Sequence, residues 1–479
     1  MLSLLSKKIL VIGYGAVAKC VLHELFSFFD IEPSQLYVVD QSPVFSKHDF
    51  HTYVAYMDAT SFPSFCDSIP LKESDIVIDL TFSSATYAFI RTCLERGYFY
   101  VNTSIEDNAD PLGGQSIALQ QHTVRSLFRD FSAHHPVRSS ILTECGQNPG
   151  LIQHYVLYAL NELQKKESGV DDYRRDTLVA MIDRYQIGSI LMSEIDGMKT
   201  DRPLGDKLYN TWSVAGFVVE SMDNTELVRG TDNPYIQPVL TPDMRSPALT
   251  ELFAPYQVPG NEVVFLRECG YHTSMPSVAP IPYQDHLICV PFQGRLIHHG
   301  EVFELARYFG AKAPFMSYVY KNSPYLDQSM EMFMARHQCS EDELLHYIKN
   351  KPDSFCVFDN INVEDAFRMK GFDSIGCAMY CGKNTIDKIF WCGSILTHTD
   401  AHIHPHFTPT ITQVAAGVLS GLSYILEPDT PVGLYEPCDL HTPYMLQKSK
   451  HLLGKLVMME IPKEHVPNLH ITCGTIERP

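Results

Sequence analysis

The sequence lacks the long apolar segments that membrane and secreted proteins need. No run of about 18 or more apolar residues occurs in the chain, so we expect no transmembrane helix. The stretch from Met1 to Ile12 has two lysines and one short apolar run, and it leads into a glycine-rich turn rather than a small-residue cleavage site. These absences predict a cytoplasmic protein without a signal peptide.

Paired cysteine motifs and an excess of positive charge are also missing. The 13 cysteines are scattered and contain no CxxC pair, which is typical of reduced, mostly buried thiols. Lysine and arginine number 37 against 56 aspartates and glutamates, so the formal net charge is −19. Such a chain is not expected to bind nucleic acid or an anionic membrane. A cationic ligand suits it better, although many proteins are acidic for solubility alone.

Three common catalytic signatures are absent as well. The nucleophile elbow of serine hydrolases, the phosphate-binding P-loop and the HExxH zinc motif do not occur. No internal repeat or low-complexity tract is visible either. The 479 residues, 45% of them hydrophobic, can bury at least one large core and favour two domains over one.

Strands and helices alternate over about the first 145 residues. Short apolar runs typical of buried strands occur at Lys7–Ile12, Gln35–Val39, Asp75–Leu80 and Phe99–Thr103. Helical spacing follows the first run and recurs at Ala85–Arg96. The alternation predicts an α/β fold whose N-terminal part is a Rossmann-type, doubly wound parallel sheet.

The composition and the pattern of the sequence change from Asn148 onward. Glycine, proline and aromatic residues become frequent, and the regular alternation of strand and helix stops. Strands are predicted at Glu262–Leu266, His286–Val290 and Ile389–Leu396, and a helix with small residues on one face is predicted at Thr410–Leu426. The second part is therefore expected to be an α+β domain with long loops.

The segment GYGAVA at residues 13–18 predicts a dinucleotide-binding turn. It follows the first strand and opens a helix, and Asp40 ends the next strand 25 positions after Gly15. Gly13 permits the tight turn, Gly15 lets a pyrophosphate approach the backbone, and Ala18 replaces the usual third glycine. The anion would sit at the helix N-terminus, where free amide groups and the helix dipole favour it. A glycine turn that binds nothing is the alternative.

The acidic residue at the end of the second strand indicates NAD rather than NADP. The Asp40 carboxylate can accept hydrogen bonds from the ribose 2′-hydroxyl, whereas a 2′-phosphate would be repelled, and no arginine follows in the next three residues. The candidate cofactor-binding residues are Gly13, Tyr14, Gly15, Ala16, Val17, Asp40, Thr81 and Thr103.

Several polar segments then resemble those of a known family. They are NTSIED (102–107), GQNPGLI (146–152), NTWSVAGFVVE (210–220), HHGEVFELARYF (298–309) and TQVAAGVLSGLSYILEP (412–428). Together with GYGAVA, they resemble bacterial homospermidine synthases, within the saccharopine-dehydrogenase-like group. The resemblance spans most of the chain, and NTWS with a glutamate eight residues after its tryptophan is the most specific part. The chain departs from the family pattern between Ser221 and His286 and at Gly300, where we expect asparagine.

The resemblance implies an NAD-dependent transferase that joins two putrescines. NAD would take a hydride from a carbon that bears an amine, ammonia would leave, and a second putrescine would add through a new imine. The same NADH would then return the hydride, so the reaction has no net redox change. This chemistry needs carboxylates for a diamine dication, a face that stabilises an iminium and a proton shuttle. A homodimer is also implied, and spermidine is a further candidate substrate.

The resemblance gives a role to one tryptophan and three glutamates. The Trp212 ring would lie against the ammonium or iminium, a desolvated cation–π contact of about 2 kcal/mol. Glu194 and Glu220 would bind amino groups and exchange protons, and Glu106 would hold the distal amine. The alternatives are ordinary ones, a core position for the tryptophan and solvated surface positions for the glutamates.

Two further residues complete the implied catalytic set. Asn148 would hydrogen-bond the substrate or the nicotinamide amide, unless it only forms an Asx-type turn before Pro149. His299 is a candidate acid or base. His298 beside it fits that role equally well. A further alternative is that the histidine has only a structural role.

A histidine-rich segment suggests a metal site. His398, Asp400, His402, His404 and His406 lie within nine positions, and alternate histidines of a strand could bind zinc. The resembling family uses no metal, however, and no distant cysteine or carboxylate motif completes a site. We therefore expect no metal, and interpret the segment as a polar loop near the domain hinge.

The predicted organisation and two rival functions follow. An NAD-binding Rossmann domain is expected at residues 1–147, with residues 409–479 packing back on it, and an α+β substrate domain at residues 148–408. A saccharopine- or carboxynorspermidine-dehydrogenase-like oxidoreductase would need arginines for substrate carboxylates, and Arg202 and Arg295 are available. A non-catalytic NAD-binding sensor would need the glycine turn, but no carboxylates around its tryptophan.

Overall fold

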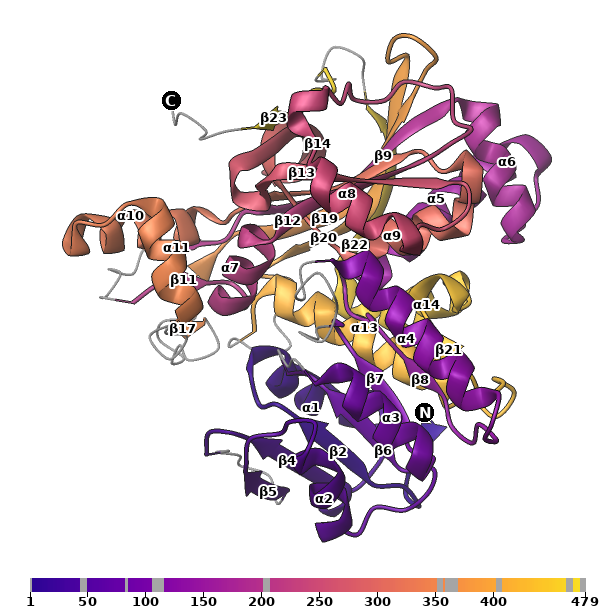
Figure 1. Cartoon of the computed structure of the whole chain (residues 1–479), viewed down its shortest axis with the longest axis vertical. Helices are drawn as coiled ribbons and strands as arrows, with labels where there is room; N and C mark the ends of the chain where they lie inside the picture. The colour runs from indigo at the N-terminus through magenta and orange to yellow at the C-terminus, as the bar shows by residue number, and fades with distance from the viewer. Residues whose placement is uncertain are drawn as a thin grey trace. The chain divides into compact units, whose positions relative to one another are not determined.

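The computed structural model divides into two compact units. It describes residues 2–43, 50–81, 85–105, 116–200, 207–350, 356–357, 369–401, 407–461 and 468–473. Unit 1 comprises Met1–Leu151 and Thr412–Leu452, and unit 2 comprises Ile152–Ile411 and Leu453–Pro479. Figure 1 shows unit 1 around strands β2 and β4 to β8, and unit 2 around strands β9 to β20.

The described part of unit 1 is built on a seven-stranded parallel sheet. Its strands, in spatial order, are β5 (His51–Val54), β4 (Leu36–Asp40), β2 (Ile9–Ile12), β6 (Ile76–Asp79), β7 (Phe99–Asn102), β8 (Ile141–Leu142) and β21 (Leu434–Tyr435). With β2 counted first, the order 3-2-1-4-5-6 is that of the doubly wound Rossmann fold, extended by β21. Strand β2 reads ILVI and is buried throughout, because a parallel sheet is covered on both faces. The predicted fold class is confirmed.

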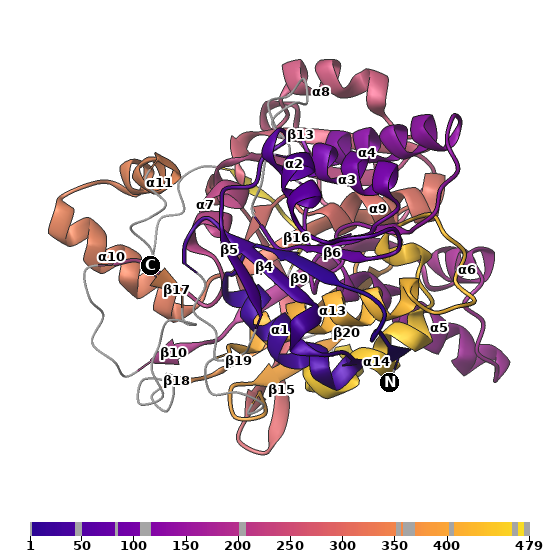
Figure 2. The same cartoon turned by 90° about the horizontal axis from the view of Figure 1, so that it is seen from below.

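Helices cover both faces of this sheet. Figure 2 shows α2 (Ser61–Ser68), α3 (Thr86–Arg96) and α4 (Ile117–Ser132) along one face, and α1 (Ala16–Phe28), α13 (Pro409–Ile425) and α14 (Thr442–Leu453) along the other. A short pair, β1 (Leu2–Ser3) with β3 (Phe29–Asp30), lies beside the end of α1. The core under α2 and α3 is apolar and includes Phe62, Phe89 and Val77.

The small residues of α13 have a packing role. A Cβ at Gly417 would lie 1.9 Å from the carbonyl oxygen of Gly146, and one at Gly421 would lie 2.3 Å from Cys145 Sγ. The helix therefore approaches the loop after β8 so closely that only glycine fits at these two positions. The predicted helix with small residues on one face is confirmed, and it holds that loop in place.

Unit 2 is built on a mixed ten-stranded sheet. The spatial order of its main path is β22 (Lys455–Ile461), β20 (Lys388–Thr397), β19 (Phe372–Cys381), β9 (Ile187–Asp196), β16 (Phe315–Lys321), β15 (His286–Ile297), β14 (Thr273–Tyr283) and β23 (Thr472–Cys473). Off this path, β12 (Asn224–Gly230) pairs with β13 (Asn261–Cys269) and with β16. The pairing is antiparallel except between β16 and β9. This confirms the mixed second domain.

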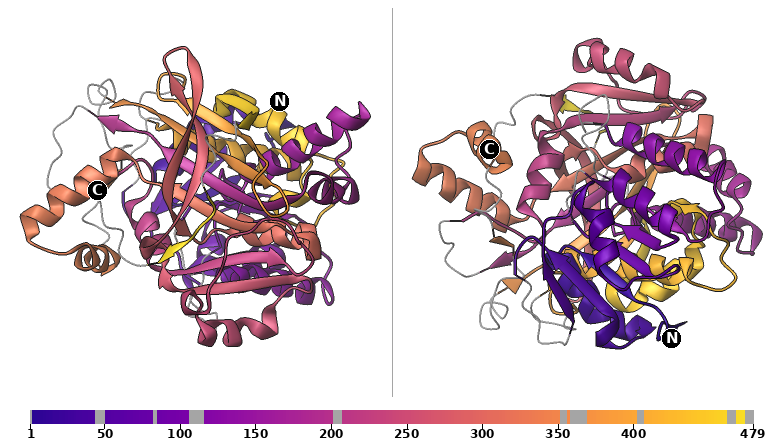
Figure 3. Two further views of the ribbon diagram at one scale, coloured as in Figure 1. Left: turned by 90° about the horizontal axis from the view of Figure 1, so that it is seen from above. Right: turned by 60° about the horizontal axis from the view of Figure 1, so that its bottom comes forward.

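The two faces of the unit 2 sheet differ in character. Leu191, Ile195 and Val319 belong to a large apolar core, which also contains Trp391. Side chains alternate along a strand, so the residues between them on β9 and β16 point to the opposite face. That opposite face carries the acids and tyrosines described below. The long hairpin of β14 and β15 stands out as a twisted ribbon in the left view of Figure 3.

Helices surround this sheet. They are α5 (Leu151–Ser168), α6 (Arg175–Tyr185), α7 (Val214–Met222), α8 (Pro247–Phe253), α9 (Gly300–Phe309), α10 (Pro324–His337) and α11 (Glu341–Asn350). Short strands also pair here, β10 (Lys199–Thr200) with β18 (Met369–Lys370) and β11 (Tyr209–Asn210) with β17 (Cys356–Val357). Among the helices of the described ranges, none has both the length and the apolar character of a membrane span.

The division of the chain differs in detail from the expected domain boundaries. From the sequence, residues 409–479 are expected to pack together with the N-terminal domain. In the structure, Thr412–Leu452 lies in unit 1, whereas Leu453–Pro479 lies in unit 2. The reason is strand β22, which hydrogen-bonds along β20 and so extends the unit 2 sheet.

Candidate functional site

The predicted dinucleotide turn has the required geometry in unit 1. Gly13 adopts a φ of 89°, and a Cβ there would lie 2.9 Å from the carbonyl oxygen of Leu80. Gly15 is the N-cap of α1, and no described atom would come within 4 Å of a Cβ at that position. Ala18 is 1% exposed, which fits its expected contact between helix and sheet. The turn thus leaves open space at a helix N-terminus, where an anion is favoured.

Asp40 lies where the ribose of a dinucleotide is expected. It ends β4, and its carboxylate accepts hydrogen bonds from the backbone amides of Tyr14 (2.7 Å) and Ser42 (2.8 Å). The side chain is only half-buried, so it remains accessible to a ligand. These bonds join the acidic residue to the glycine turn, as the motif predicts.

A buried acid that was not predicted from the sequence, Asp79, lies at the carboxyl end of β6, the strand next to β2. Asp79 Oδ1 accepts hydrogen bonds from the Thr81 amide (3.1 Å) and hydroxyl (2.6 Å), and Oδ2 accepts one from the Tyr100 hydroxyl (2.8 Å). Burial raises the pKa of the Asp79 carboxyl, and these bonds oppose the rise. The predicted cofactor residue Thr81 therefore holds Asp79 at the end of β6. A direct contact between Thr81 and a cofactor stays a prediction.

Asn148 lies in a closed loop at the end of unit 1. The Gly146 amide donates to the Pro149 carbonyl (2.8 Å), and the Leu151 amide donates to the Gly146 carbonyl (3.0 Å). Thr103 lies close by, since a Cβ at Gly146 would be 3.6 Å from its Cγ2. The structure thus brings Asn148 and Thr103 to the same edge of the sheet as the glycine turn.

Unit 2 contains a candidate site of its own, on the polar face of its sheet. Glu194 and Asp196 alternate on β9 with the core residue Ile195. Tyr320 of β16 pairs with Glu194, and Asp373 of β19 pairs with Asp196. Residues paired in register point to the same face, so three strands bring these side chains together.

Hydroxyl groups hold the buried acids. The Tyr318 hydroxyl donates to Glu194 and the Thr211 hydroxyl donates to Asp196. The Thr410 hydroxyl donates to Asp373 Oδ2 at 2.9 Å. Each of the three acids is 2% exposed or less, so these carboxyl groups are shielded from water.

Burial changes the ionisation of these acids. It raises the pKa of Glu194 to about 8, although the hydrogen bond from Tyr318 opposes the rise. It raises the pKa of Asp196 to about 7, again against a hydrogen bond, from Thr211. The pKa of Asp373 is also raised, by burial and by the charges of Glu194 and Asp196. Such a group of acids is poised to ionise when a cation binds.

His299 lies between two carboxylates at the N-terminus of α9. Its Nε2 is 3.4 Å from Glu220 Oε2, its Nδ1 is 3.3 Å from Glu301 Oε2, and its ring stacks on Tyr318 with centroids 3.9 Å apart. Burial lowers the pKa of the imidazole, but the charges of Glu301 and Glu220 outweigh it and raise the pKa to about 10. The two flanking carboxylates therefore favour the protonated form of His299, which can donate a proton.

The neighbouring histidine has different surroundings. His298 Nε2 is 3.8 Å from Asp223 and its Nδ1 is 4.0 Å from Glu226. Burial lowers its pKa, against the charge of Asp223. Because His299 contacts Glu220 and Tyr318, we infer that His299, not His298, belongs to the candidate site.

Trp212 lies two residues before α7, the helix that carries Glu220. Its indole Nε1 donates to the Tyr320 hydroxyl at 3.3 Å, and the ring is half-buried. A Cβ at Gly216 would lie 2.7 Å from Trp212 Cζ3, so glycine is needed for the ring to lie over the helix. The other tryptophan, Trp391, is fully buried in the apolar core. The two tryptophans therefore have different surroundings, and the role of Trp212 in the site stays a prediction.

The structure thus brings four of the six predicted catalytic residues together in unit 2: Trp212, Glu194, Glu220 and His299. Asn148 belongs to unit 1, and Glu106 lies outside the described residues, as do His402, His404 and His406. Within the part of the chain that is described, no group of three or more His, Cys, Asp or Glu residues has the arrangement of a metal site.

Sequence reasoning missed five side chains on this face. They are Asp196, Glu301, Tyr318, Tyr320 and Asp373. A signal was present for two of them, because Asp196 lies two residues after Glu194 on one strand and Glu301 lies two residues after His299. The other three lie on β16 and β19, which only the register of the sheet brings next to β9.

The N-terminal part matches a known family of cofactor-binding domains. Residues 9–131 match the family model described as the saccharopine dehydrogenase NADP binding domain. This segment contains the glycine turn and Asp40, which together form the expected dinucleotide site of unit 1.

Curated relatives match the chain over most of its length. The homospermidine synthase of Mesorhizobium japonicum is 22% identical over 476 residues, which cover 91% of this chain and 88% of the relative. That of Blastochloris viridis is 23% identical over 477 residues, with 94% and 90% covered. The chain is similar to homospermidine synthases. The resemblance inferred from the motifs is confirmed.

A solved homospermidine synthase has the same fold. The crystal structure of the enzyme from Legionella pneumophila, in complex with NAD, superposes with a TM-score of 0.74 at 19% identity. The match covers 95% of this chain and 91% of that chain. The architecture of both units is therefore shared with a homospermidine synthase.

Proposed function

We propose that this chain is an NAD-dependent homospermidine synthase, which joins two putrescines with release of ammonia and no net redox change. One observation carries the proposal. Three buried acids of unit 2 (Glu194, Asp196 and Asp373) lie near the half-buried Trp212 and near His299, which has a carboxylate on each side. Buried, closely spaced carboxylates are costly unless a cation neutralises them. A diamine dication supplies that charge.

Three residues of unit 2 have separate roles in the proposed reaction. Glu194, with a pKa of about 8, binds one ammonium as a carboxylate and accepts a proton when the amine has to lose one. The Trp212 ring, oriented by its bond to Tyr320, stabilises the cationic iminium. His299, held as an imidazolium by Glu220 and Glu301, donates the proton that the leaving amine needs to depart as ammonia.

Unit 1 would hold NAD, which supplies a hydride acceptor and donor when bound. The glycine turn would take the pyrophosphate and Asp40 the ribose diol. The matched family model carries NADP in its name. We favour NAD, because a 2′-phosphate would meet the Asp40 carboxylate and no basic residue lies between Gln41 and Pro43. The proposal includes a cytoplasmic homodimer, as the resemblance implies.

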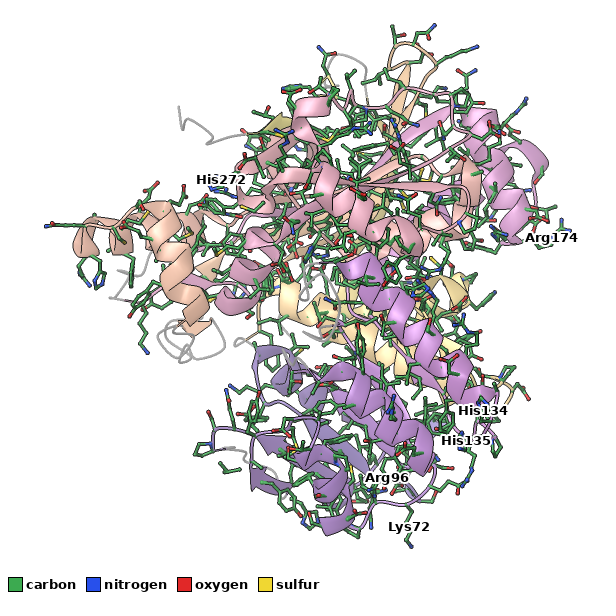
Figure 4. All side chains as sticks on the ribbon, viewed as in Figure 1. Lys72, Arg96, His134, His135, Arg174 and His272 are labelled. Atoms are coloured by element: carbon green, nitrogen blue, oxygen red, sulfur yellow. The ribbon has the colours of Figure 1, made fainter. Side chains whose placement is uncertain are left out.

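The alternative hypothesis, a dehydrogenase, requires arginines that bind a substrate carboxylate. Arg202 lies outside the described residues. The Arg295 guanidinium donates to the Tyr271 carbonyl at 2.6 Å and lies 4.0 Å from Glu341. Arg174, at the N-cap of α6, points outward from unit 2 and pairs with Asp172 (Figure 4). None of these described contacts favours a carboxylate substrate.

Incubation with putrescine and NAD, followed by amine analysis, tests the proposal. We expect homospermidine and ammonia without growth of NADH absorbance. Putrescine deuterated at the carbons that bear nitrogen should give homospermidine that keeps the transferred deuterium, because the same bound cofactor takes and returns the hydride. Accumulation of one NADH per substrate consumed would favour the dehydrogenase instead, and NAD binding without any turnover would favour the sensor.

Substitution of Asp40 tests the cofactor assignment. Asp40→Ala should weaken NAD binding by about 1.5–3 kcal/mol, the typical effect of losing hydrogen bonds to a charged group. NADP binding should weaken less or improve, because the repulsion is removed. Isothermal titration with both dinucleotides measures this, and Asp130→Ala, at an exposed aspartate on α4, is the control. Equal affinity of the unaltered protein for NAD and NADP would contradict the assignment.

The pH dependence of amine binding follows from the raised pKa values. Glu194 and Asp196 bind a cation as carboxylates, and they ionise near pH 8 and pH 7. Putrescine affinity should therefore rise as the pH increases from about 6 to about 8, where amines of this kind remain protonated. Calorimetry across this range measures the slope. Glu194→Gln should flatten it, whereas Glu167→Gln, at a partly exposed ion pair, should not. An affinity independent of pH would refute the carboxylate assignment.

A further inference from the structure

One tyrosine contacts both groups to which we assign proton transfer. The Tyr318 hydroxyl donates to Glu194 Oε2, and its ring stacks on the His299 imidazole with centroids 3.9 Å apart and an angle of 22° between the planes. Tyr318 is 1% exposed, and burial raises the pKa of its phenol well above the usual value. The phenol therefore keeps its proton around neutral pH and remains a donor to the carboxyl group.

The strands explain why these three side chains meet. Tyr320, the next residue of β16 on the same face as Tyr318, pairs with Glu194 of β9. Glu194 is thus a diagonal neighbour of Tyr318 across the two strands, within reach of a long aromatic side chain. On its other side, Tyr318 pairs with Ile297, the last residue of β15, and His299 follows as the N-cap of α9. The turn from β15 into α9 therefore brings the imidazole over the tyrosine ring.

The two contacts of Tyr318 stabilise opposite charges. A hydroxyl that donates to a carboxyl oxygen stabilises the carboxylate, because a hydrogen bond to a charged acceptor is stronger than one to a neutral acceptor. The face of an aromatic ring is electrostatically negative and stabilises a cation. Here that cation is the imidazolium, which Glu220 and Glu301 also favour.

Other titratable groups surround the same two residues. Besides Tyr318 and His299, those around Glu194 are Asp196 of β9, Asp373 of β19, Tyr320 of β16 and Glu220 of α7. Those around His299 are Glu220, Glu301 and His298. Burial and the neighbouring acids raise the pKa of Glu194, and the hydrogen bond from Tyr318 is the main contact that lowers it.

We propose that Tyr318 is a positioning residue that holds Glu194 as a carboxylate through its hydroxyl and His299 as an imidazolium through its ring. The proposal rests on the proposed function, because it takes Glu194 as the base and His299 as the acid. Activity that needs both charged forms rises with pH as the carboxyl group ionises and falls as the imidazolium loses its proton, which gives a bell-shaped profile. The hydroxyl acts on the acid limb of this profile, and the ring acts on the alkaline limb.

Two substitutions separate the hydroxyl from the ring. Tyr318→Phe removes the hydroxyl and keeps the ring, whereas Tyr318→Leu removes both. Tyr380→Phe is the matched control, because Tyr380 of β19 is a fully buried tyrosine in the apolar core of the same sheet.

Three measurements report on the two charged groups. The first is the pH profile of kcat/KM for putrescine. The second is the titration of the carboxyl group by difference infrared spectroscopy, assigned by comparison with Glu194→Gln. The third is the titration of the imidazole by NMR, assigned by comparison with His299→Gln. Both titrations use the protein without substrate, so they are independent of turnover.

We expect Tyr318→Phe to move the acid limb and the carboxyl titration to higher pH by about one pH unit or more, because a hydrogen bond to a charged group is lost. The alkaline limb and the imidazole titration should stay in place in this variant. They should move to lower pH in Tyr318→Leu, where the ring face is lost as well. Tyr380→Phe should move neither limb.

The proposal is overturned if the acid limb stays in place in folded Tyr318→Phe, or the alkaline limb in folded Tyr318→Leu. If Tyr318→Leu does not fold, a fluorinated tyrosine in place of Tyr318 decides. Fluorine strengthens the hydroxyl as a donor and weakens the negative face of the ring, so both limbs should move to lower pH. A protein whose titrations shift as expected but that makes no homospermidine would refute the proposed function and retain the coupling of the two groups by Tyr318.

Discussion

Replacing Trp212 by alanine should remove most of the activity and leave the fold intact. A cation–π contact at a desolvated site contributes about 2 kcal/mol, so kcat/KM should fall about 30-fold or more. Phenylalanine keeps a weaker aromatic face but loses the hydrogen bond from the indole to Tyr320, so Trp212→Phe should retain part of the activity. Steady-state kinetics with putrescine, alongside thermal unfolding, measures both effects.

The second tryptophan is the matched control for this experiment. Trp391 is fully buried in the apolar core of unit 2. Its replacement by alanine should cost about 3–5 kcal/mol of unfolding free energy, as large-to-small changes in a core do. Replacement of the half-buried Trp212 by alanine should lower the unfolding free energy much less. Equal activity of Trp212→Ala and the unaltered protein would return Trp212 to a packing role.

Glu220→Gln should slow turnover by about 10²–10³-fold without a matching loss of NAD affinity, because general acid–base groups contribute effects of this size. Glu220 holds His299 through the contact of 3.4 Å between Oε2 and Nε2, and its charge helps to keep that imidazole protonated. The loss should appear mainly in kcat for putrescine, since the dinucleotide turn is formed by unit 1 residues.

The pH profile separates this role from a purely structural one. We propose His299 as the acid of the reaction, and its pKa is raised to about 10, so activity should fall as the pH rises through that value. Without the Glu220 charge the pKa of His299 drops, and the alkaline limb should move to lower pH. Glu268→Gln, at an exposed position on β13, should leave the limb in place. A loss of kcat in Glu220→Gln with an unmoved limb would refute the coupling to His299.

Local sequence patterns predicted unit 1 well. A buried parallel strand is a continuous apolar run bounded by turn residues, so ILVI before GYG could hardly be anything else. The position of Asp40 followed from the same logic, because the residue that ends a neighbouring parallel strand faces the glycine turn. The course of β22 was not predictable in this way. Its segment, KLVMMEI, shows only that it is a strand, not which sheet edge it joins.

The site of unit 2 was predictable only in part. Glu194, Glu220 and Trp212 came from the resemblance, and single residues of these types carry no local signal of function. The tyrosines and Asp373 were missed because β16 (315–321) and β19 (372–381) both lie more than 100 residues after β9 (187–196) in the sequence. Which residues meet depends on register, and register is set by the whole sheet. The choice of His299 over His298 likewise needed the contacts themselves.

The buried acids make the stability of the empty protein depend on its ligand. Glu194 and Asp196 have folded-state pKa values above their ordinary ones, so their contribution to stability is complete below about pH 4 and is lost as the pH rises through 7 and 8. Over the same interval their affinity for a cation grows. A bound diamine would therefore stabilise the fold most under the conditions in which the free protein is weakest. In a cell, the lifetime of the protein would then follow the supply of its substrate.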